Sequence, residues 1–325
     1  MRIVSLLPGA TEIVYALGLG EQLAAVSHEC DEPPSVAAKP RVTRSLIATE
    51  ACSSAEIHRQ VHARVSRGES LYALDDALLR AIQPDLILAQ ELCPVCAVSP
   101  REVEAAVAGL PKRPTILTLN PRSLEDVLHD ILRVGEAAGI PERARVVVDG
   151  LRARIDFVRC AAAAARGRPA TVLLEWLDPP MCGGHWNPEL IELAGGRDPL
   201  GRPGTPARVI AWEAVAAAAP EVLVIAACGC DIPRTMAELH RLAEPGGPAA
   251  LLRDLPATRK GFAYVADANR YFARPGPRLV DSLEILARLI HPEIFGPAEE
   301  PEMVQPWHPA PVRAPGPPSP ALTPP

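Results

Sequence analysis

Two cysteines three positions apart stand in the segment ELCPVCAVSP, residues 91–100, directly after an apolar run that is typical of a buried strand. A C-x-x-C pair serves as a disulfide, a redox couple, part of a metal site or two small core residues, and the spacing alone does not separate these uses. A thioredoxin-type couple opens a helix, whereas Pro94 and Pro100 frame Cys93 and Cys96 as a loop. Redox chemistry is therefore disfavoured, and ligand or metal binding stays open.

Other chemically useful side chains also follow predicted strands. In an open parallel sheet the loops at the carboxyl ends of the strands converge on one edge, and ligands bind there. Six of the eight cysteines lie in or beside such loops. The residues that we expect to contact a ligand are Pro8, Thr11, Glu12, Glu29, Glu91, Glu175, Trp176, Gly184, Trp186, Asn269 and Tyr271.

Soft metal ligands occur in the same loops. Thiolate and imidazole groups suit zinc, iron or an iron-sulfur cluster, and a C-x-x-C pair fills only two of the four positions that zinc prefers. The candidate metal ligands are His28, Cys30, Cys93, Cys96, His185, Cys228 and Cys230. Cys52 and Cys160 lie elsewhere in the pattern, and we interpret them as small core residues.

Aromatic residues make up only 4% of the chain, and Trp176, Trp186 and Tyr271 all follow predicted strands. This placement favours a flat apolar surface for a ligand with a large face, and core packing is the alternative, above all for Trp176. Glu175 and Asp178 would suit a catalytic carboxylate pair. No nucleophile and base accompany them, so capping and hydrogen bonding are the favoured roles.

Composition excludes several classes of partner. A net charge of -6, with basic residues scattered along 325 positions, gives no footprint for nucleic acid or for an anionic membrane. The glycine-rich pieces match neither the P-loop nor the dinucleotide fingerprint. The apolar start of the chain is too short for a signal-peptide core, and no segment is long enough to span a bilayer. We therefore expect a cytoplasmic protein whose cysteines are mostly reduced.

Strand-like runs alternate with helical patterns along the whole chain, which predicts an α/β fold with parallel sheets. A helix over 141–167, about 38 Å long, separates two such series. We expect one lobe over about 1–140 and a second over about 168–296. Residues 297–325 contain 11 prolines in 29 positions and predict a disordered tail. The expected strands are 3–7, 23–27, 85–89, 115–119, 171–176, 222–226 and 262–265.

Several segments together resemble one known family. They are RIVSLLPGATEIVYALGLGEQLAAVSHECDEP, LDDALLRAIQPDLILAQELC, the long central helix, GGHWNPELIELAGG, WEAVAAAAPEVLVIA and YFARPGPRLVDSLEILARLIHPE. The resemblance is to the iron-siderophore and cobalamin periplasmic-binding proteins, also called helical-backbone metal receptors, and it covers about residues 1–296. The chain is most similar to the branch described as cobalamin-binding.

The resemblance implies two Rossmann-like lobes joined by one rigid helix, with a ligand cleft between them. It implies a non-catalytic binding protein for a cobalamin-like corrinoid or another small metal chelate, with an ABC permease as partner. Because we expect a cytoplasmic protein, we also expect this chain to differ from the exported receptors of the family. The alternative is a cytoplasmic metal- or cluster-binding protein, or an enzyme, that uses the Cys and His residues of the same cleft.

Overall fold

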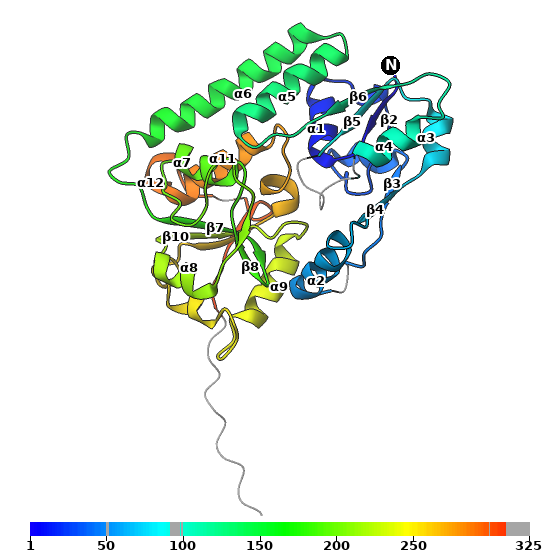
Figure 1. Ribbon diagram of the computed structural model, residues 1–325. Helices are drawn as coiled ribbons and strands as arrows, with labels where there is room; N and C mark the ends of the chain where they lie inside the picture. The colour runs from blue at the N-terminus through cyan, green and yellow to red at the C-terminus, as the bar shows by residue number, and fades with distance from the viewer. Residues whose placement is uncertain (50–51, 92–97, 99, 299, 310–325) are drawn as a thin grey trace, which may run out of the picture.

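The computed structural model describes residues 1–49, 52–91, 98, 100–298 and 300–309. Each of two lobes is built around its own sheet. The helices α5 (Leu124–Ala137) and α6 (Pro141–Ala162) lie above lobe 2 and reach lobe 1 beside α1 (Figure 1). The expected α/β class with two lobes and a long connecting helix is confirmed. Helix α6 begins at Pro141 as expected, and it ends at Ala162, five residues earlier than the sequence pattern indicates.

Lobe 1 contains a sheet of four parallel strands in the order β2-β1-β5-β6. Side chains of its central strands alternate between two apolar clusters, with Ile3 and Leu88 on one face and Val4 and Ile87 on the other. Both faces are therefore covered, as a parallel sheet requires. Its elements are β1 (Ile3–Ser5), α1 (Pro8–Ala16), β2 (Leu23–Val26), α3 (Asp76–Ile82), β5 (Leu86–Ala89), α4 (Pro100–Val107) and β6 (Thr115–Thr118).

An arm leaves lobe 1 after β2 and returns to it before β5. Strands β3 (Thr43–Ser45) and β4 (Tyr72–Leu74) form an antiparallel ribbon, and α2 (Ser54–Val65) lies at its far end. Ser53 and Glu56 form a capping box at the start of α2. The arm carries α2 across to lobe 2, where it lies beside α9 (Figure 1).

Lobe 2 contains a six-stranded sheet in the order β12-β11-β10-β7-β8-β9. The three central strands are parallel, while β12 at one edge and β8 and β9 at the other are antiparallel. Its strands are β7 (Thr171–Leu177), β8 (Pro180–Cys182), β9 (Arg208–Val209), β10 (Val222–Ile225), β11 (Ala263–Ala266) and β12 (Val304–Pro306). Its helices are α7 (Asn187–Leu193), α8 (Trp212–Ala218), α9 (Ile232–Leu242), α10 (Pro256–Lys260), α11 (Leu279–Ile290) and α12 (Pro292–Phe295).

The last described residues correct the expectation of a tail that starts at residue 297. Strand β12 pairs with β11, and Trp307 directly after it is 0% exposed in the core of lobe 2. The prolines do not prevent this arrangement, because an edge strand needs few backbone donors. Residues 310–325 of the expected tail lie outside the described part of the chain.

Helix α6 is fixed to both lobes. It packs against α5 and against α11, and Arg154 on α6 forms ion pairs with Asp281 and Glu284 on α11. Gly135 of α5 lies so close to Ala144 that a Cβ there would stand 2.3 Å from the Ala144 Cβ. Among the residues that the structure describes, no helix is long and apolar enough to cross a membrane.

Candidate functional site at the boundary between the lobes

Four small polar side chains form a buried cluster at the carboxyl ends of β1 and β2. The Thr11 hydroxyl donates to Ser5 Oγ at 2.8 Å and lies 3.1 Å from the Cys30 Sγ, which in turn lies 3.6 Å from Ser27 Oγ. Burial raises the pKa of the Cys30 thiol. Thr11 and Cys30 therefore connect the segments that follow β1 and β2. The Cys30 sulfur is enclosed among these side chains and is not open to a metal ion.

His28 and Glu29 belong to the same loop. His28 Nδ1 lies 2.7 Å from the Thr43 hydroxyl, and Nε2 lies 3.2 Å from a carboxylate oxygen of Glu29. The hydrogen bond from His28 holds the pKa of the exposed Glu29 below its ordinary value. His28 Nδ1 is thus held by Thr43 within lobe 1, Nε2 has only the charged contact with Glu29, and Glu29 remains accessible.

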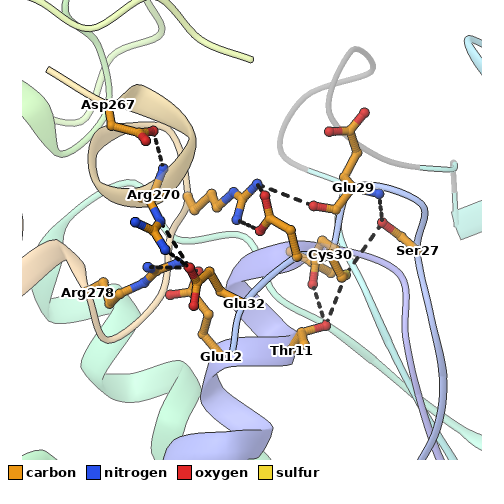
Figure 2. A network of polar contacts seen from close by, with 12 residues as sticks. Thr11, Glu12, Ser27, Glu29, Cys30, Glu32, Asp267, Arg270 and Arg278 are labelled. Carbon is orange, nitrogen blue, oxygen red and sulfur yellow. Dashed lines mark hydrogen bonds and ion pairs between the residues drawn. The ribbon is translucent and has the colours of Figure 1, made fainter. Parts of the chain in front are cut away.

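Three arginines of lobe 2 face three carboxylates of lobe 1 directly beyond this loop. Figure 2 labels Arg278, Arg270, Glu12 and Glu32 of this group. Arg278 Nη2 donates to Glu12 Oε1 at 2.8 Å. Arg270 Nε donates to Glu32 Oε1 at 3.0 Å. The third pair, Arg274 and Asp31, is bidentate, with one contact of 3.0 Å between Nη2 and Oδ2. The carboxyl-end loops of the two sheets therefore meet at this boundary.

Glu12 is the most enclosed of the three carboxylates. It is 7% exposed, and its Oε2 atom has no hydrogen-bond partner. Burial raises the pKa of Glu12 above its ordinary value, against the opposing effect of Arg278. Glu12, predicted as a ligand contact, is instead engaged in the contact between the lobes.

Glu175 organises the loop after β7. Its Oε1 atom accepts hydrogen bonds from the Gly184 backbone at 2.8 Å and from Asn187 Nδ2 at 2.6 Å. A Cβ at Gly184 would stand 2.1 Å from the Ala207 nitrogen, so only glycine fits this close approach of two backbones. Glu175 and Gly184 thus have structural roles, in agreement with the hydrogen-bonding interpretation of Glu175.

Two of the three aromatic candidates are core residues, which corrects the expectation of a broad aromatic ligand surface. Trp186 is 6% exposed, and its Nε1 donates to the Phe272 carbonyl at 2.9 Å. Tyr271 is equally buried, with the Arg278 guanidinium 5.7 Å from its ring centre. Trp176 is half-buried, and its Nε1 donates to the Asp178 carbonyl at 3.1 Å. It is the aromatic candidate with accessible surface.

The remaining candidate metal ligands of lobe 2 lie in different settings. His185 has a left-handed backbone with φ 50°, its ring stacks on Trp186, and burial lowers the pKa of its imidazole. Cys230 is buried, and burial raises its pKa to about 11, while Cys228 is exposed. Across the described ranges, no three His, Cys, Asp or Glu residues gather into a group that could hold a metal ion. Cys93 and Cys96 lie outside those ranges.

Several other sequence predictions can be placed. Pro8 occupies the first turn of α1 and is partly exposed, and Asn269 is partly exposed on a π-helical turn, Ala268–Phe272. Glu91 is exposed, and its backbone nitrogen donates to Asn120 Oδ1 at 2.7 Å. Cys160 is exposed on α6, so its interpretation as a core residue is wrong. The thiol lies on the outward face of the helix, where the sequence has no apolar pattern that would predict its burial.

Glu32, Arg274 and Arg278 were not among the predicted site residues. A signal for them exists in the sequence: the segment ARPGPR, residues 273–278, places two arginines around a Pro-Gly-Pro turn shortly after a predicted strand. The partners of Arg274 and Arg278 are 243 and 266 positions away in the chain, so no local pattern reveals the pairing.

Comparison with known proteins defines the class of this chain. A profile of the family described as periplasmic binding protein matches residues 3–268. The chain belongs to this family, and the expected non-catalytic binding protein is confirmed. The cytoplasmic assignment is wrong, because the family to which the chain belongs is described as periplasmic binding protein. The inference that the cysteines are reduced loses its basis with that assignment.

Individual relatives are similar over most of their length. The vitamin B12-binding protein of Vibrio cholerae is 24% identical over 287 residues, which cover 87% of this chain and 86% of the relative. Among solved structures, a periplasmic heme-binding protein from Pseudomonas aeruginosa has a TM-score of 0.71 at 21% identity and covers 96% of this chain and 99% of its own. The crystal structure of BtuF, the Vibrio cholerae vitamin B12-binding protein, has a TM-score of 0.63 at 24% identity, with coverages of 89% and 96%.

Proposed function

We propose that this protein holds a cobalamin-like corrinoid, or another metal chelate with a large flat face, between its two lobes. The observation that carries the proposal is that the carboxyl-end loops of both sheets meet at one boundary, where ligands of open α/β sheets bind. The similarity to proteins named for vitamin B12 and heme supports the choice of ligand class.

The ligand contacts that we propose are the accessible members of the predicted set. They are Pro8, Glu29, Glu91, Trp176 and Asn269. Trp176 is the penultimate residue of β7, and the other four follow a strand at its carboxyl end. Trp176 offers an aromatic surface for a planar macrocycle. The other members of the set are occupied in holding each lobe or the two lobes together.

Titration of the purified protein with cyanocobalamin and, separately, with hemin tests the proposal. We expect one of the two to bind at one molecule per chain with a dissociation constant of about 1 μM or tighter, seen by calorimetry and by quenching of tryptophan fluorescence. Trp176→Ala should weaken binding roughly tenfold. The matched control is Trp212→Phe, in the buried core of lobe 2, which should leave the affinity unchanged. Failure of both compounds to bind at about 100 μM would exclude this ligand class.

We further propose that the loaded protein delivers its ligand to an ABC-type permease. The proposal follows from membership in the periplasmic binding protein family. Cells that lack the gene should take up radiolabelled ligand more slowly than cells that carry it. Equal uptake, with binding to the purified protein intact, would separate storage or scavenging from transport.

A further inference from the structure

The charges at the boundary between the lobes are sorted by lobe. Glu12, Asp31 and Glu32 come from lobe 1, and their partners Arg278, Arg274 and Arg270 come from lobe 2. No pair among these six joins residues of the same lobe. The ion pairs therefore act on the distance between the lobes and contribute little to the internal packing of either one.

The three pairs differ in exposure. Glu12 and Arg278 are mostly enclosed, and the Arg274 side chain is only 8% exposed, whereas the Arg270 side chain is 39% exposed. Solvent and salt weaken exposed pairs far more than enclosed ones. Asp31, the partner of Arg274, is 55% exposed, so this pair and the pair of Arg270 and Glu32 both open more readily than the pair of Arg278 and Glu12, whose side chains are 21% and 7% exposed.

A direct contact between two backbones lies beside the enclosed pair. A Cβ added at Gly9 in the first turn of α1 would stand 2.4 Å from the Pro275 carbonyl oxygen of lobe 2. A Cβ added at Gly276 would stand 3.2 Å from the Gly9 Cα and 2.9 Å from Glu12 Oε2. Neither glycine has a positive φ, so their small size, and not their backbone freedom, is what this contact requires.

A second connection joins the lobes at the end of the arm. Glu238 on α9 accepts hydrogen bonds from the backbone and the hydroxyl of Ser54 at 2.8 and 2.6 Å. Arg234 Nη2 donates to the backbone carbonyls of Thr49 and Cys52. Together with helix α6, these contacts hold the lobes at three separate places.

We propose that the first turn of α1 and the segment 274–278 form a fixed pivot, and that the three ion pairs form a clasp that sets the spacing of the lobes before a ligand arrives. In this arrangement Gly9 and Gly276 set the closest approach, and the arginines are positioning residues that hold it. The spacing between the lobes limits the thickness of the ligand that the boundary accepts. This consequence rests on the proposed binding function. The spacing itself does not depend on that function.

Gly9→Ala tests the pivot without altering any charge. Alanine favours a helix more than glycine does, so this change would stabilise α1 if the lobes were independent. We expect instead that the added methyl group pushes the lobes apart, which increases the radius of gyration of the ligand-free protein in small-angle scattering. Gly150→Ala on the exposed face of α6, where no atom lies within 4 Å, is the matched control and should leave the scattering profile unchanged. An unaltered radius of gyration for Gly9→Ala would overturn the pivot.

Charge reversal tests the clasp. Glu32→Arg and Arg270→Glu should each place like charges opposite one another, expand the ligand-free protein and accelerate amide hydrogen exchange in residues 268–278 by roughly tenfold. The double variant restores opposite charges within this pair and should recover most of the compact profile, since position 32 then still faces Arg278, which lies 3.9 Å from Glu32 in the wild type. Arg259→Glu, which breaks an exposed pair inside lobe 2, is the control. Single variants that match the wild type, or a double variant that stays expanded, would overturn the clasp.

Ligand binding provides the last measurement. If the clasp sets the spacing, the expanded variants should bind the titrated chelate roughly tenfold more weakly, and the double variant should regain affinity. Because scattering is measured without ligand, a clasp that behaves as expected in a protein that binds neither cyanocobalamin nor hemin would refute the proposed ligand and leave the clasp standing.

Discussion

The two lobes begin their central strands with the same local device. In lobe 1, helix α3 ends at Gln83 in the left-handed conformation, followed by Pro84 and Asp85 and then by β5. In lobe 2, helix α8 ends at Ala219 in the same conformation, followed by Pro220, Glu221 and then β10. The left-handed residue stops the helix, and the proline prevents it from continuing.

The acidic residue of each device binds an equivalent backbone nitrogen. Asp85 accepts a hydrogen bond from the Arg2 backbone at 2.8 Å, and Glu221 accepts one from the Ala170 backbone at 3.1 Å. Arg2 and Ala170 immediately precede β1 and β7, the first strand of each lobe. Each carboxylate thus aligns the start of two neighbouring parallel strands, which teaches that the lobes share their way of setting register.

The lobes differ at the edges of their sheets. Lobe 2 adds antiparallel strands on both sides of its parallel centre, and β12 brings Trp307 into the core. The described part of lobe 1 has no antiparallel strand in its four-stranded sheet. The shared device therefore sets the centre of each lobe, and the additional strands make the C-terminal segment part of lobe 2 alone.

Removal of the Trp307 side chain should have the largest effect on stability, because it disrupts the C-terminal strand packing that lobe 2 has and lobe 1 lacks. Trp307→Ala leaves a cavity in a fully buried site and should destabilise the protein by about 3–5 kcal/mol. For a chain of this size the melting temperature should fall by roughly 10 °C. Truncation after residue 309 is the control, and calorimetry should find it close to the wild type. A variant that melts with the wild type would show that the C-terminal strand adds little to lobe 2.

Replacement of the left-handed residues should have a smaller and opposite effect. Gln83→Gly and Ala219→Gly each remove the strain of a side chain at positive φ, 53° and 44°, and should stabilise the protein by about 0.5–1 kcal/mol. Similar gains in both lobes would support the equivalence of the two devices. Gly261→Ala, at the left-handed end of α10, is the reverse control and should lose about 1 kcal/mol. Denaturant unfolding measures all three, and a loss in either glycine variant would contradict the comparison.

Asp85 should give the smallest effect, visible in its pH dependence. The hydrogen bond and charge of Lys112, together with the Arg2 backbone, lower the pKa of Asp85 from 3.8 to about 2. A depressed pKa means that the ionised carboxylate stabilises the fold above about pH 4 and that this contribution is lost as the pH falls through 2. Asp85→Asn should therefore melt below the wild type at pH 7, with a difference that narrows as the pH falls toward 2. A difference that is constant with pH would assign the effect to geometry instead of charge.

Much of the fold could be predicted from local patterns. All seven expected strands exist, and α6 begins where Pro141 predicts, because apolar runs and proline or glycine boundaries act over a few residues. The strands β3, β4, β8, β9 and β12 were not predicted. They have two or three residues each, β8 and β12 contain proline, and they are defined by pairing with a strand elsewhere and not by their own pattern.

The site was predictable as a region and less so as individual contacts. Parallel topology predicted that Thr11, Glu12 and Glu29 lie near one edge of the sheet, because the carboxyl ends of parallel strands share an edge. In the structure Thr11 and Glu12 lie in α1, directly after β1, and Glu29 lies in the loop after β2. The direction of the Trp186 side chain depends on packing against Phe272, which lies 86 positions away. The pairing of charges across the boundary depends on the relative placement of two lobes, and no local pattern contains that information.

The sorted charges at the boundary also have a consequence for the order in which the protein forms. The sheet of lobe 1 uses residues 3–118 and the sheet of lobe 2 uses residues 171–306, so no strand is exchanged between them. A chain that emerges from the ribosome can complete lobe 1 while lobe 2 is still being made, since domains fold as units from the N-terminal side. The arginine partners of Glu12, Asp31 and Glu32 become available only when residues 270–278 have been synthesised. The two lobes therefore join through these ion pairs only after both lobes have formed.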